Sequence, residues 1–164
     1  MTSSLLSLLL CVSSALLVTV NAGCSRAGVP TVCTCPSGWT QRDKHCYLFV
    51  RGQVDWATAE RACIAYGGNL ASFHSRAEYD FLRTVVYRAT GSNPRTWVGA
   101  SDAVKDGNWL WSDGSRFSSV SWGAGEPNNA GGREDCMEIN RNGGDYINDE
   151  RCTTTLNFIC AKHL

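Results

Sequence analysis

The sequence has no excess of charge of one sign and few long apolar runs. Its 15 Lys and Arg residues balance 15 Asp and Glu residues, so no net charge attracts nucleic acid or an anionic membrane surface. Only residues 5–20 form a long apolar run, and no Asn-x-Ser/Thr acceptor for N-glycosylation is present. A chain of 164 residues with these properties is expected to be one domain with a short appendage. Neither nucleic acid nor a membrane interior is expected as its partner.

Cysteine, in contrast, is abundant. Nine cysteines in so short a chain indicate an oxidising compartment, where disulfides form and persist. Residues 5–20 are apolar and small, and Val20 and Ala22 match a cleavage site after Ala22. A membrane anchor is the competing interpretation, but about 16 apolar residues are short for a span of ~20. We therefore predict that residues 1–22 are a signal peptide and that the mature protein is secreted and extracellular.

Cleavage after Ala22 would remove Cys11 and leave an even number of cysteines, which fits a complete disulfide framework. The remaining cysteines are Cys24, Cys33, Cys35, Cys46, Cys63, Cys136, Cys152 and Cys160. Their number alone leaves the connectivity open. Residues 23–34 are expected to be a short loop-like lead that contains Cys24 and Cys33, and residues 35–164 the folded domain.

Two helices are predicted in the first half of this domain. Asp55 is a suitable N-cap for a helix over residues 56–66, whose apolar residues share one face and which a Gly-Gly pair ends. Ser75 and Glu78 have the spacing of a capping box that begins a second helix. That helix has an apolar stripe and ends within residues 91–94.

Short apolar runs bounded by Asp-Gly or Asn-Gly turns predict strands in the rest of the domain. The runs are residues 97–100, 109–111, 136–139 and 158–160. A polar turn at residues 41–45 between aromatic residues predicts a hairpin, which a Cys35–Cys46 disulfide would clip. Two helices followed by strands and a long loop rich in Gly, Ser, Asn and Asp make an α+β domain.

Oxygen-bearing side chains are concentrated in residues 122–152. They occur as Glu126-Pro127-Asn128, Glu134-Asp135 and Asn148-Asp149. Ca²⁺ takes roughly 6–8 oxygen ligands in flexible geometry, so this density predicts a calcium site. Pro127 permits a cis peptide bond, which would turn the side chains of Glu126 and Asn128 toward one point. The ligands come from two separated segments and do not fit an EF-hand loop.

Together these motifs resemble the C-type lectin-like domains, in the long form with an additional N-terminal hairpin. The resemblance covers residues 35–164. It is carried by Trp97-Val98-Gly99-Ala100, where the family has Trp-Ile-Gly-Leu, and by the three oxygen-rich motifs in their order. It implies a C-type lectin-like fold with two helices, small antiparallel sheets and a long calcium-binding loop, braced by disulfides.

The resemblance also implies the disulfide pairings. They are Cys35–Cys46, Cys63–Cys160 and Cys136–Cys152. Cys24 and Cys33 have no counterpart in the basic pattern of the family. They pair either with each other or between two chains, which would give a disulfide-linked homodimer, and the sequence does not decide between these alternatives.

The resemblance further implies two calcium sites. The sugar-binding Ca²⁺ of the family falls on Glu126, Asn128, Glu134, Asn148 and Asp149, which would bind both the ion and the carbohydrate. A second, structural Ca²⁺ of some members falls on Asp102, Asp106, Asn129, Glu134 and Asp135. Asn129 stands there in place of a carboxylate and removes one negative charge, which weakens that site. Ile147 replaces the family's usual Trp before the Asn-Asp pair, at a packing position rather than a ligand position.

These residue types suit sugar binding. A sugar hydroxyl can ligate Ca²⁺, donate to a carboxylate such as Glu126 and accept from an amide such as Asn128. In the family, the order carboxylate-Pro-amide accompanies vicinal equatorial hydroxyls, as in mannose, and the reversed type, amide-Pro-acid, accompanies galactose. The sequence therefore predicts a secreted, calcium-dependent, mannose-type lectin. Its partners would be glycans on cell or microbial surfaces, in innate defence or agglutination.

Two binding alternatives stay open. One is a galactose-binding lectin despite the motif, and the other is an ice-binding protein like the type II antifreeze proteins, which use the same fold. On composition alone, acidic and amide residues in a Gly-rich loop would be solvated turn formers. The five-position match favours a binding site instead.

An enzyme is not expected. The alternative is a glycosidase in which Glu126 and Glu134 form the acid–base pair. In the family, however, such carboxylates coordinate metal, which keeps them ionised. The aromatic residues also allow two interpretations. Trp109, Trp111 and Trp122 would be either sugar-stacking platforms or core residues, and their apolar neighbours favour the core.

Overall fold

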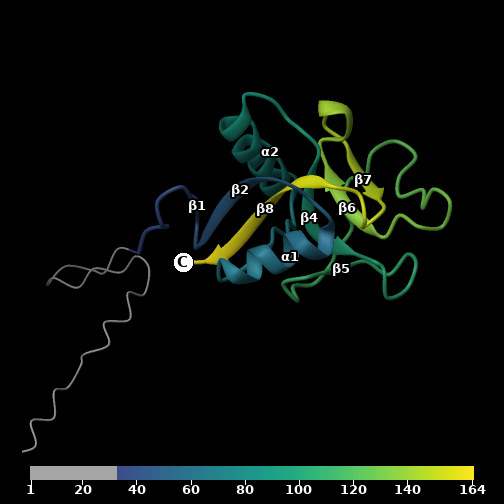
Figure 1. Cartoon of the computed structure of the whole chain (residues 1–164), viewed down its shortest axis with the longest axis horizontal. Coiled ribbons are helices and arrows are strands. Elements are labelled where there is room, and N and C mark those ends of the chain that lie inside the picture. The colour runs from purple at the N-terminus through teal and green to yellow at the C-terminus, as the bar shows by residue number, and fades with distance from the viewer. Residues whose placement is uncertain (1–32) are drawn as a thin grey trace, which may run out of the picture.

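The computed structural model describes residues 33–164, so the predicted cleavage after Ala22 and the pairing of Cys24 lie outside the described part of the chain. The helices are α1 (Trp56–Ala65), α2 (Arg76–Thr90) and a 3₁₀ turn, η1 (Arg141–Gly143). The strands are β1 (Thr40–Arg42), β2 (His45–Val54), β3 (Asn69–Leu70), β4 (Thr96–Ser101), β5 (Leu110–Trp111), β6 (Cys136–Ile139), β7 (Ile147–Glu150) and β8 (Leu156–His163). Figure 1 shows their arrangement, which confirms the predicted α+β class. Among residues 33–164 there is no helix with the length and apolar character to cross a bilayer.

The strands of the described region form one mixed sheet. Its order is β1-β2-β8-β4-β6-β7, with β3 added to β8 and β5 added to β4. The pairing of β4 with β8 is parallel, and the other pairings are antiparallel. A parallel pair requires a long crossover connection, which residues 102–155 supply. The small antiparallel sheets expected from the resemblance are thus joined, through β4 and β8, into one sheet.

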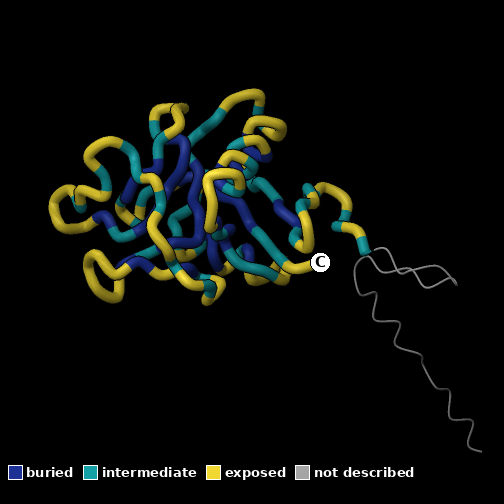
Figure 2. Tube along the Cα trace, turned by 180° about the vertical axis from the view of Figure 1, so that it is seen from behind, coloured by how far each residue is buried: buried dark blue, intermediate teal, exposed yellow. Residues whose placement is uncertain are grey.

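The sheet separates two hydrophobic cores, because successive side chains of a strand point to opposite faces. On β8, Ile159 packs in the core that α2 covers, whereas Phe158 and Cys160 pack in the core that α1 covers. On β4, Val98 belongs to the first core and Trp97 to the second. Figure 2 shows these strands as the buried centre of the domain, with exposed loops and outer helix surfaces around them.

Both helices begin with the predicted caps. The carboxylate of Asp55 accepts the backbone N–H of Thr58 at 2.7 Å. The hydroxyl of Ser75 accepts the N–H of Glu78 at 3.2 Å, and the Glu78 carboxylate accepts the N–H of His74 at 2.7 Å. The return bond of the capping box therefore reaches one residue further than the standard motif. α1 ends one residue earlier than predicted.

Three disulfides brace the domain. They join Cys35 to Cys46, Cys63 to Cys160 and Cys136 to Cys152, which are the pairings that the resemblance implies. The first clips the N-terminal hairpin, the second ties α1 to β8, and the third ties β6 to the turn after β7. In the chain-entropy model such cross-links contribute roughly 2–4 kcal/mol each. Cys33 is disulfide-bonded as well, and the covalent homodimer stays a prediction.

The sequence does not predict β7, although this strand carries two of the expected ligands. Strands are recognised by β-branched, aromatic or alternating apolar residues, and β7 reads Ile-Asn-Asp-Glu. Asn148 and Asp149 are 0% and 1% exposed. Polar side chains are tolerated at such depth when they are hydrogen-bonded, so β7 owes its place in the sheet to contacts with distant residues rather than to local pattern.

Replacing Asp55 with Ala would remove the N-cap of α1. We expect the free energy of unfolding to fall by about 1 kcal/mol, as measured by urea denaturation. The hydrogen bond from Thr58 lowers the pKa of Asp55, so this stabilisation is present above the unfolded aspartate pKa and is lost as pH falls through the folded value. Asp55→Asn retains an acceptor and is the matched control. Equal stability of the Ala and Asn variants at neutral pH would contradict the capping role.

Candidate functional site

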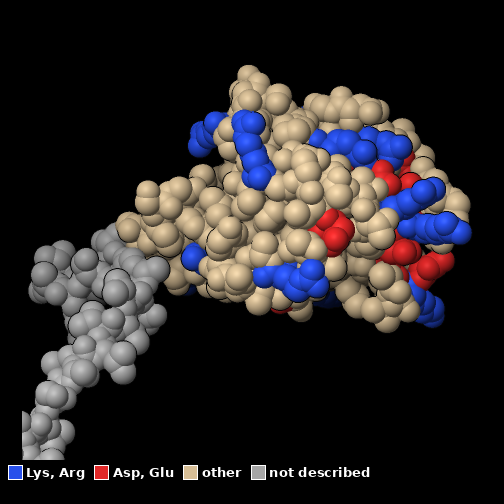
Figure 3. Space-filling model, viewed as in Figure 1, with Lys and Arg blue, Asp and Glu red and all other residues tan. Residues whose placement is uncertain are grey.

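The oxygen-rich segments meet at one end of the molecule. The site loop, residues 122–135, leads into β6, and β7 brings Asn148 and Asp149 beside it. In Figure 3, Asp and Glu side chains gather at this end, with Lys and Arg side chains around them. The same view in Figure 1 places this end away from β1 and the C-terminus. The predicted ligands from the two separated segments therefore do share one region.

Asp149 holds the site loop against the sheet. Its two carboxylate oxygens accept the backbone N–H groups of Asn128 at 3.1 Å and of Asn129 at 2.7 Å. Within the loop, the carboxylate of Glu134 accepts the N–H of Ala130 at 2.9 Å, which ties the two ends of the turn at residues 130–134 together. Both carboxylates are buried, and buried charge is tolerated only with such donors. The side chain of Asn128 itself is exposed on the loop.

Glu126 lies next to Asp149, and the Glu126–Pro127 peptide bond is cis. The hydroxyl of Tyr146 donates to one Glu126 oxygen at 3.3 Å, and the other oxygen, Oε2, is buried without a hydrogen-bond partner. Burial raises the pKa of the Glu126 carboxyl, and the neighbouring Asp149 carboxylate raises it further. Two carboxylates placed this close favour the binding of a cation between or beside them.

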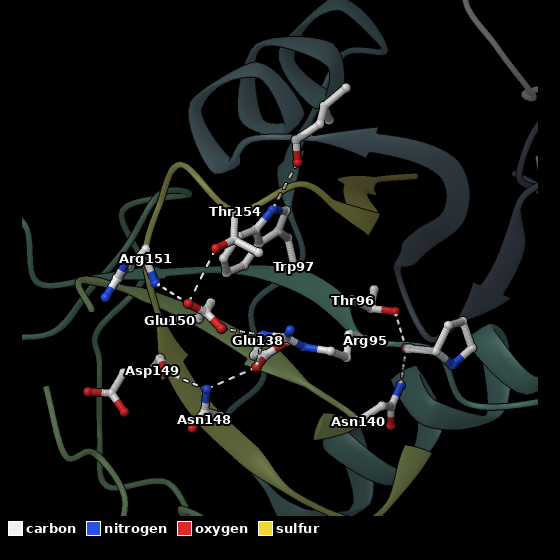
Figure 4. A network of polar contacts seen from close by, with 12 residues as sticks. Arg95, Thr96, Trp97, Glu138, Asn140, Asn148, Asp149, Glu150, Arg151 and Thr154 are labelled. Atoms are coloured by element: carbon white, nitrogen blue, oxygen red, sulfur yellow. Dashed lines mark hydrogen bonds and ion pairs between the residues drawn. The ribbon is translucent and has the colours of Figure 1, made fainter. Parts of the chain in front are cut away.

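Asn148 belongs to a buried polar network, shown in Figure 4. Its Nδ2 donates to Glu138 Oε1 at 2.9 Å and to the backbone carbonyl of Asp149. Arg95 holds the fully buried Glu138 with two hydrogen bonds of 2.6 Å each and also contacts Glu150. The hydrogen bond to Glu138 raises the pKa of Arg95, which keeps the guanidinium charged. The Oδ1 of Asn148, the expected ligand atom, is buried without a hydrogen-bond partner.

Sequence reasoning missed three residues of this region: Arg95, Glu138 and Tyr146. For Glu138 a signal was present, because a carboxylate inside the apolar run Cys-Met-Glu-Ile would need a charged partner when the strand is buried. Arg95 and Tyr146 carry no comparable signal. Their contacts arise from residues distant in the chain, which no local pattern specifies.

The second predicted calcium site is only partly brought together. One oxygen of the buried Asp102 accepts a backbone N–H, and the other, Oδ1, has no partner. Asn129 donates to Asp106 at 3.2 Å and accepts the N–H of Glu134 at 3.1 Å. Asp135 contacts Asp102 through its backbone carbonyl. Burial raises the pKa of Asp102, and Asp135 and Asp106 add to the rise.

The residues fit calcium by chemistry more than by preformed geometry. Within residues 33–164, no three or more His, Cys, Asp or Glu side chains are grouped as a metal centre. The predicted set, however, mixes carboxylate and amide oxygens, which are the ligands that Ca²⁺ takes. Three buried oxygens without partners lie among the predicted ligands: Glu126 Oε2, Asn148 Oδ1 and Asp102 Oδ1. Buried polar atoms are normally satisfied, and a cation bound in this region would satisfy such oxygens.

Two of the three tryptophans considered for sugar stacking belong to the core, and the third packs against it. Trp109 and Trp111 are 7% and 4% exposed. Trp122 is partly buried and packs against Trp109 with ring centroids 4.8 Å apart. The core interpretation is confirmed for Trp109 and Trp111.

Comparison with known proteins agrees with this architecture. Residues 52–162 match the sequence profile of the family described as Lectin C-type domain. Over 131 residues the chain is 46% identical to the galactose-specific lectin nattectin of Thalassophryne nattereri, a match that covers 80% of this chain and 82% of nattectin.

Two solved structures extend the comparison. The herring type II antifreeze protein matches with a TM-score of 0.73 and 32% identity, over 79% of this chain and 99% of that protein. The cow carbohydrate-recognition domain of CD23, solved in the presence of a GlcNAc2Man3 oligosaccharide, matches with a TM-score of 0.71 and 34% identity, over 80% and 97%.

The mixed sheet, the three disulfides and the loop beside β7 thus define a domain of the lectin type. The chain belongs to the C-type lectin family, because the family profile spans most of the described domain and a relative at 46% identity covers four fifths of the chain. The resemblance inferred from the motifs is confirmed. None of the three proteins compared is named for an enzymatic reaction.

The raised pKa of Glu126 predicts how the metal-free protein responds to pH. A carboxyl whose folded pKa is raised contributes stability that is fully present below the unfolded glutamate pKa and is lost as pH rises through the folded value. In EDTA, we therefore expect the melting temperature to fall as pH rises above the ordinary glutamate pKa of about 4.3, because the raised pKa of Glu126 places its ionisation there. Glu126→Gln, which cannot ionise, should flatten that part of the curve.

The matched control for this measurement is Asp43→Asn, an exposed position in the turn between β1 and β2. If the Glu126→Gln curve keeps the slope of the unmodified protein, the repulsion between Glu126 and Asp149 is not a feature of the metal-free state.

Proposed function

We propose that this member of the C-type lectin family binds carbohydrate in a calcium-dependent manner, through Glu126, Asn128, Glu134, Asn148 and Asp149. The observation that carries the proposal is a pair of partnerless buried oxygens, Glu126 Oε2 and Asn148 Oδ1, in a region where the carboxylates of Glu126 and Asp149 repel each other. No enzymatic activity is proposed.

Each predicted ligand has a distinct task in this proposal. Ca²⁺, when bound, supplies the positive charge that offsets the carboxylates and the open coordination positions that sugar hydroxyls take. Glu126 accepts a hydrogen bond from a sugar hydroxyl, because ionised carboxylates are acceptors only. The exposed amide of Asn128 donates to a hydroxyl oxygen. Asp149 and Glu134 keep the loop backbone at residues 128–130 in place through hydrogen bonds to its N–H groups.

We infer mannose-type selectivity from the order of Glu126 and Asn128. The carboxylate precedes Pro127 and the amide follows it, which is the order that accompanies vicinal equatorial hydroxyls in the resemblance. The likeness to the CD23 domain, solved in the presence of a mannose-containing oligosaccharide, supports this choice.

Galactose is the second candidate ligand. It is favoured by the 46% identity to a relative named as galactose-specific, which is a higher identity than that to the CD23 domain. Ice binding is a third candidate and is favoured only by the structural likeness to the herring antifreeze protein. Thermal hysteresis without glycan binding would favour this third candidate over both sugars.

We propose that the protein is secreted. The predicted signal peptide, residues 1–22, supports this, and so do the three disulfides, which persist in oxidising compartments. A shallow site for one sugar unit binds weakly, so recognition of cell or microbial surfaces in defence or agglutination requires several sites on one particle.

Calcium removal tests the proposal directly. On a glycan array, binding should disappear in EDTA and return with Ca²⁺, because the ligand oxygens of the site repel one another without the cation. Asn148→Ala and Asp149→Ala should also abolish binding while the disulfide-braced core stays folded by circular dichroism. Asp80→Asn, an exposed acid on α2, is the control. Binding that is unchanged in EDTA would sink the calcium-dependent mechanism.

Exchanging the roles of the two motif residues tests the selectivity. The double variant Glu126→Gln with Asn128→Asp places the amide before Pro127 and the carboxylate after it. We expect its preference to move from mannose toward galactose, measured as the ratio of the two inhibitory sugar concentrations. An unmodified protein that already prefers galactose would show that the motif does not set selectivity in this chain.

A further inference from the structure

An ion pair between the partly exposed Arg95 and the fully buried Glu138 stands directly behind the predicted ligand Asn148. Glu138 on β6 and Asn148 on β7 are cross-strand partners, and both are 0% exposed. Arg95 precedes β4 and reaches Glu138 with Nε and Nη2, each 2.6 Å from one carboxylate oxygen. Figure 4 shows the three side chains in contact, in the order Arg95, Glu138, Asn148.

Stability alone does not explain this ion pair. Placing a carboxylate inside a sheet is unfavourable unless its oxygens are bonded, and here Arg95 satisfies both oxygens of Glu138. A pair of apolar side chains of similar volume often stabilises a core as well or better. The distinctive feature of Glu138 is therefore its third contact, the hydrogen bond that it accepts from Asn148.

That contact determines which way the Asn148 amide faces. An amide has two donor hydrogens on nitrogen and one acceptor oxygen. The Nδ2 of Asn148 meets two acceptors, Glu138 Oε1 and the backbone carbonyl of Asp149. A flipped amide would place Oδ1 against both oxygens, which is repulsive. Both hydrogens are thus used within the protein, and Oδ1 is left buried without a partner.

We propose that Arg95 and Glu138 are positioning residues of the binding site, which hold the Asn148 amide so that its oxygen faces the cation site. The inference rests on the function proposed above. In the metal-free protein both amide hydrogens of Asn148 are bonded within the protein, and its oxygen is the atom left for the cation. Asn128, exposed on the site loop, has no such lock.

The first test uses NMR to measure how fast the side-chain amide hydrogens of Asn148 exchange with solvent in the metal-free protein. The side-chain amide resonance of Asn148, assigned by its disappearance in Asn148→Asp, should exchange slowly with solvent. Glu138→Leu removes its acceptor and should speed the exchange by about tenfold or more. The amide of Asn128 in the same spectrum is the internal reference for an exposed group. If Asn148 exchanges as fast as Asn128, the amide is not locked and the proposal is wrong.

The second test measures calcium affinity by titration calorimetry. The double variant Arg95→Met with Glu138→Leu replaces the ion pair with apolar side chains, so we expect it to remain folded. Its calcium affinity should fall by about 10- to 100-fold, the effect typical of losing a partner that orients a metal ligand. Glu150→Gln is the matched control, because it removes the charge of the other partner of Arg95 and keeps the contact between Glu138 and Asn148. A double variant with unchanged calcium affinity overturns the proposal.

Two further outcomes are informative. If the double variant does not fold, Arg95→Lys replaces it, since Lys keeps the charge but cannot form the two-pronged contact. It should lose affinity in the same direction, and unchanged affinity would again overturn the proposal. If the unmodified protein binds no calcium, the proposed function fails, while the amide exchange in metal-free protein still decides whether Arg95 and Glu138 position Asn148.

Discussion

The carboxylate of Asp149 holds the site loop to the sheet, and the geometry of the site depends on this contact. This carboxylate projects from β7, which ends the sheet order β1-β2-β8-β4-β6-β7, and it accepts two consecutive backbone N–H groups of the loop. An ionised carboxylate has about four lone-pair positions, so capacity remains for another partner. The same group is therefore the anchor of the loop in the metal-free protein and an expected ligand of the cation. Ligand binding and loop order are coupled through it.

Charge is distributed unevenly around this anchor. Arg95 sits on one side of the β6–β7 pair and forms ion pairs with both Glu138 and Glu150. On the loop side, the carboxylates of Glu126 and Asp149 raise each other's energy when both are ionised. The acids of this region thus form two groups. Glu138 and Glu150 are paired with Arg95, whereas Glu126 and Asp149 repel each other until a cation relieves the repulsion. The first group supports the second through Asn148.

The comparisons unite a lectin named for galactose, an antifreeze protein and a carbohydrate-recognition domain solved in the presence of a mannose-containing oligosaccharide. Such variety on one fold has a physical reason. The fold depends on two cores that the strands β4 and β8 share, together with the disulfides. Selectivity depends on a few donors and acceptors of an exposed loop, which can change without disturbing either core. Membership of the family therefore defines the kind of site more firmly than its sugar.

Much of the fold and part of the site could be predicted from the sequence. Local patterns were sufficient for the cap at Asp55, both helices, the first hairpin and most strands, since each depends on residues close together in the chain. The resemblance then supplied the three disulfide pairings and the oxygen-rich motifs. β7 was not predictable in this way, because its buried residues are polar and depend on partners elsewhere.

The sequence by itself determined which carboxylates and amides are available to the site. It also determined their order around Pro127 and their spacing from Cys136 and Cys152. Only the tertiary structure decided how they are used. It placed Glu138 opposite Asn148 and brought Arg95 to them across 43 residues of chain. It also left the side-chain oxygen Oδ1 of Asn148 buried without a hydrogen-bond partner. The orientation of an amide depends on the acceptors around it, and those acceptors meet only when β4, β6 and β7 pair.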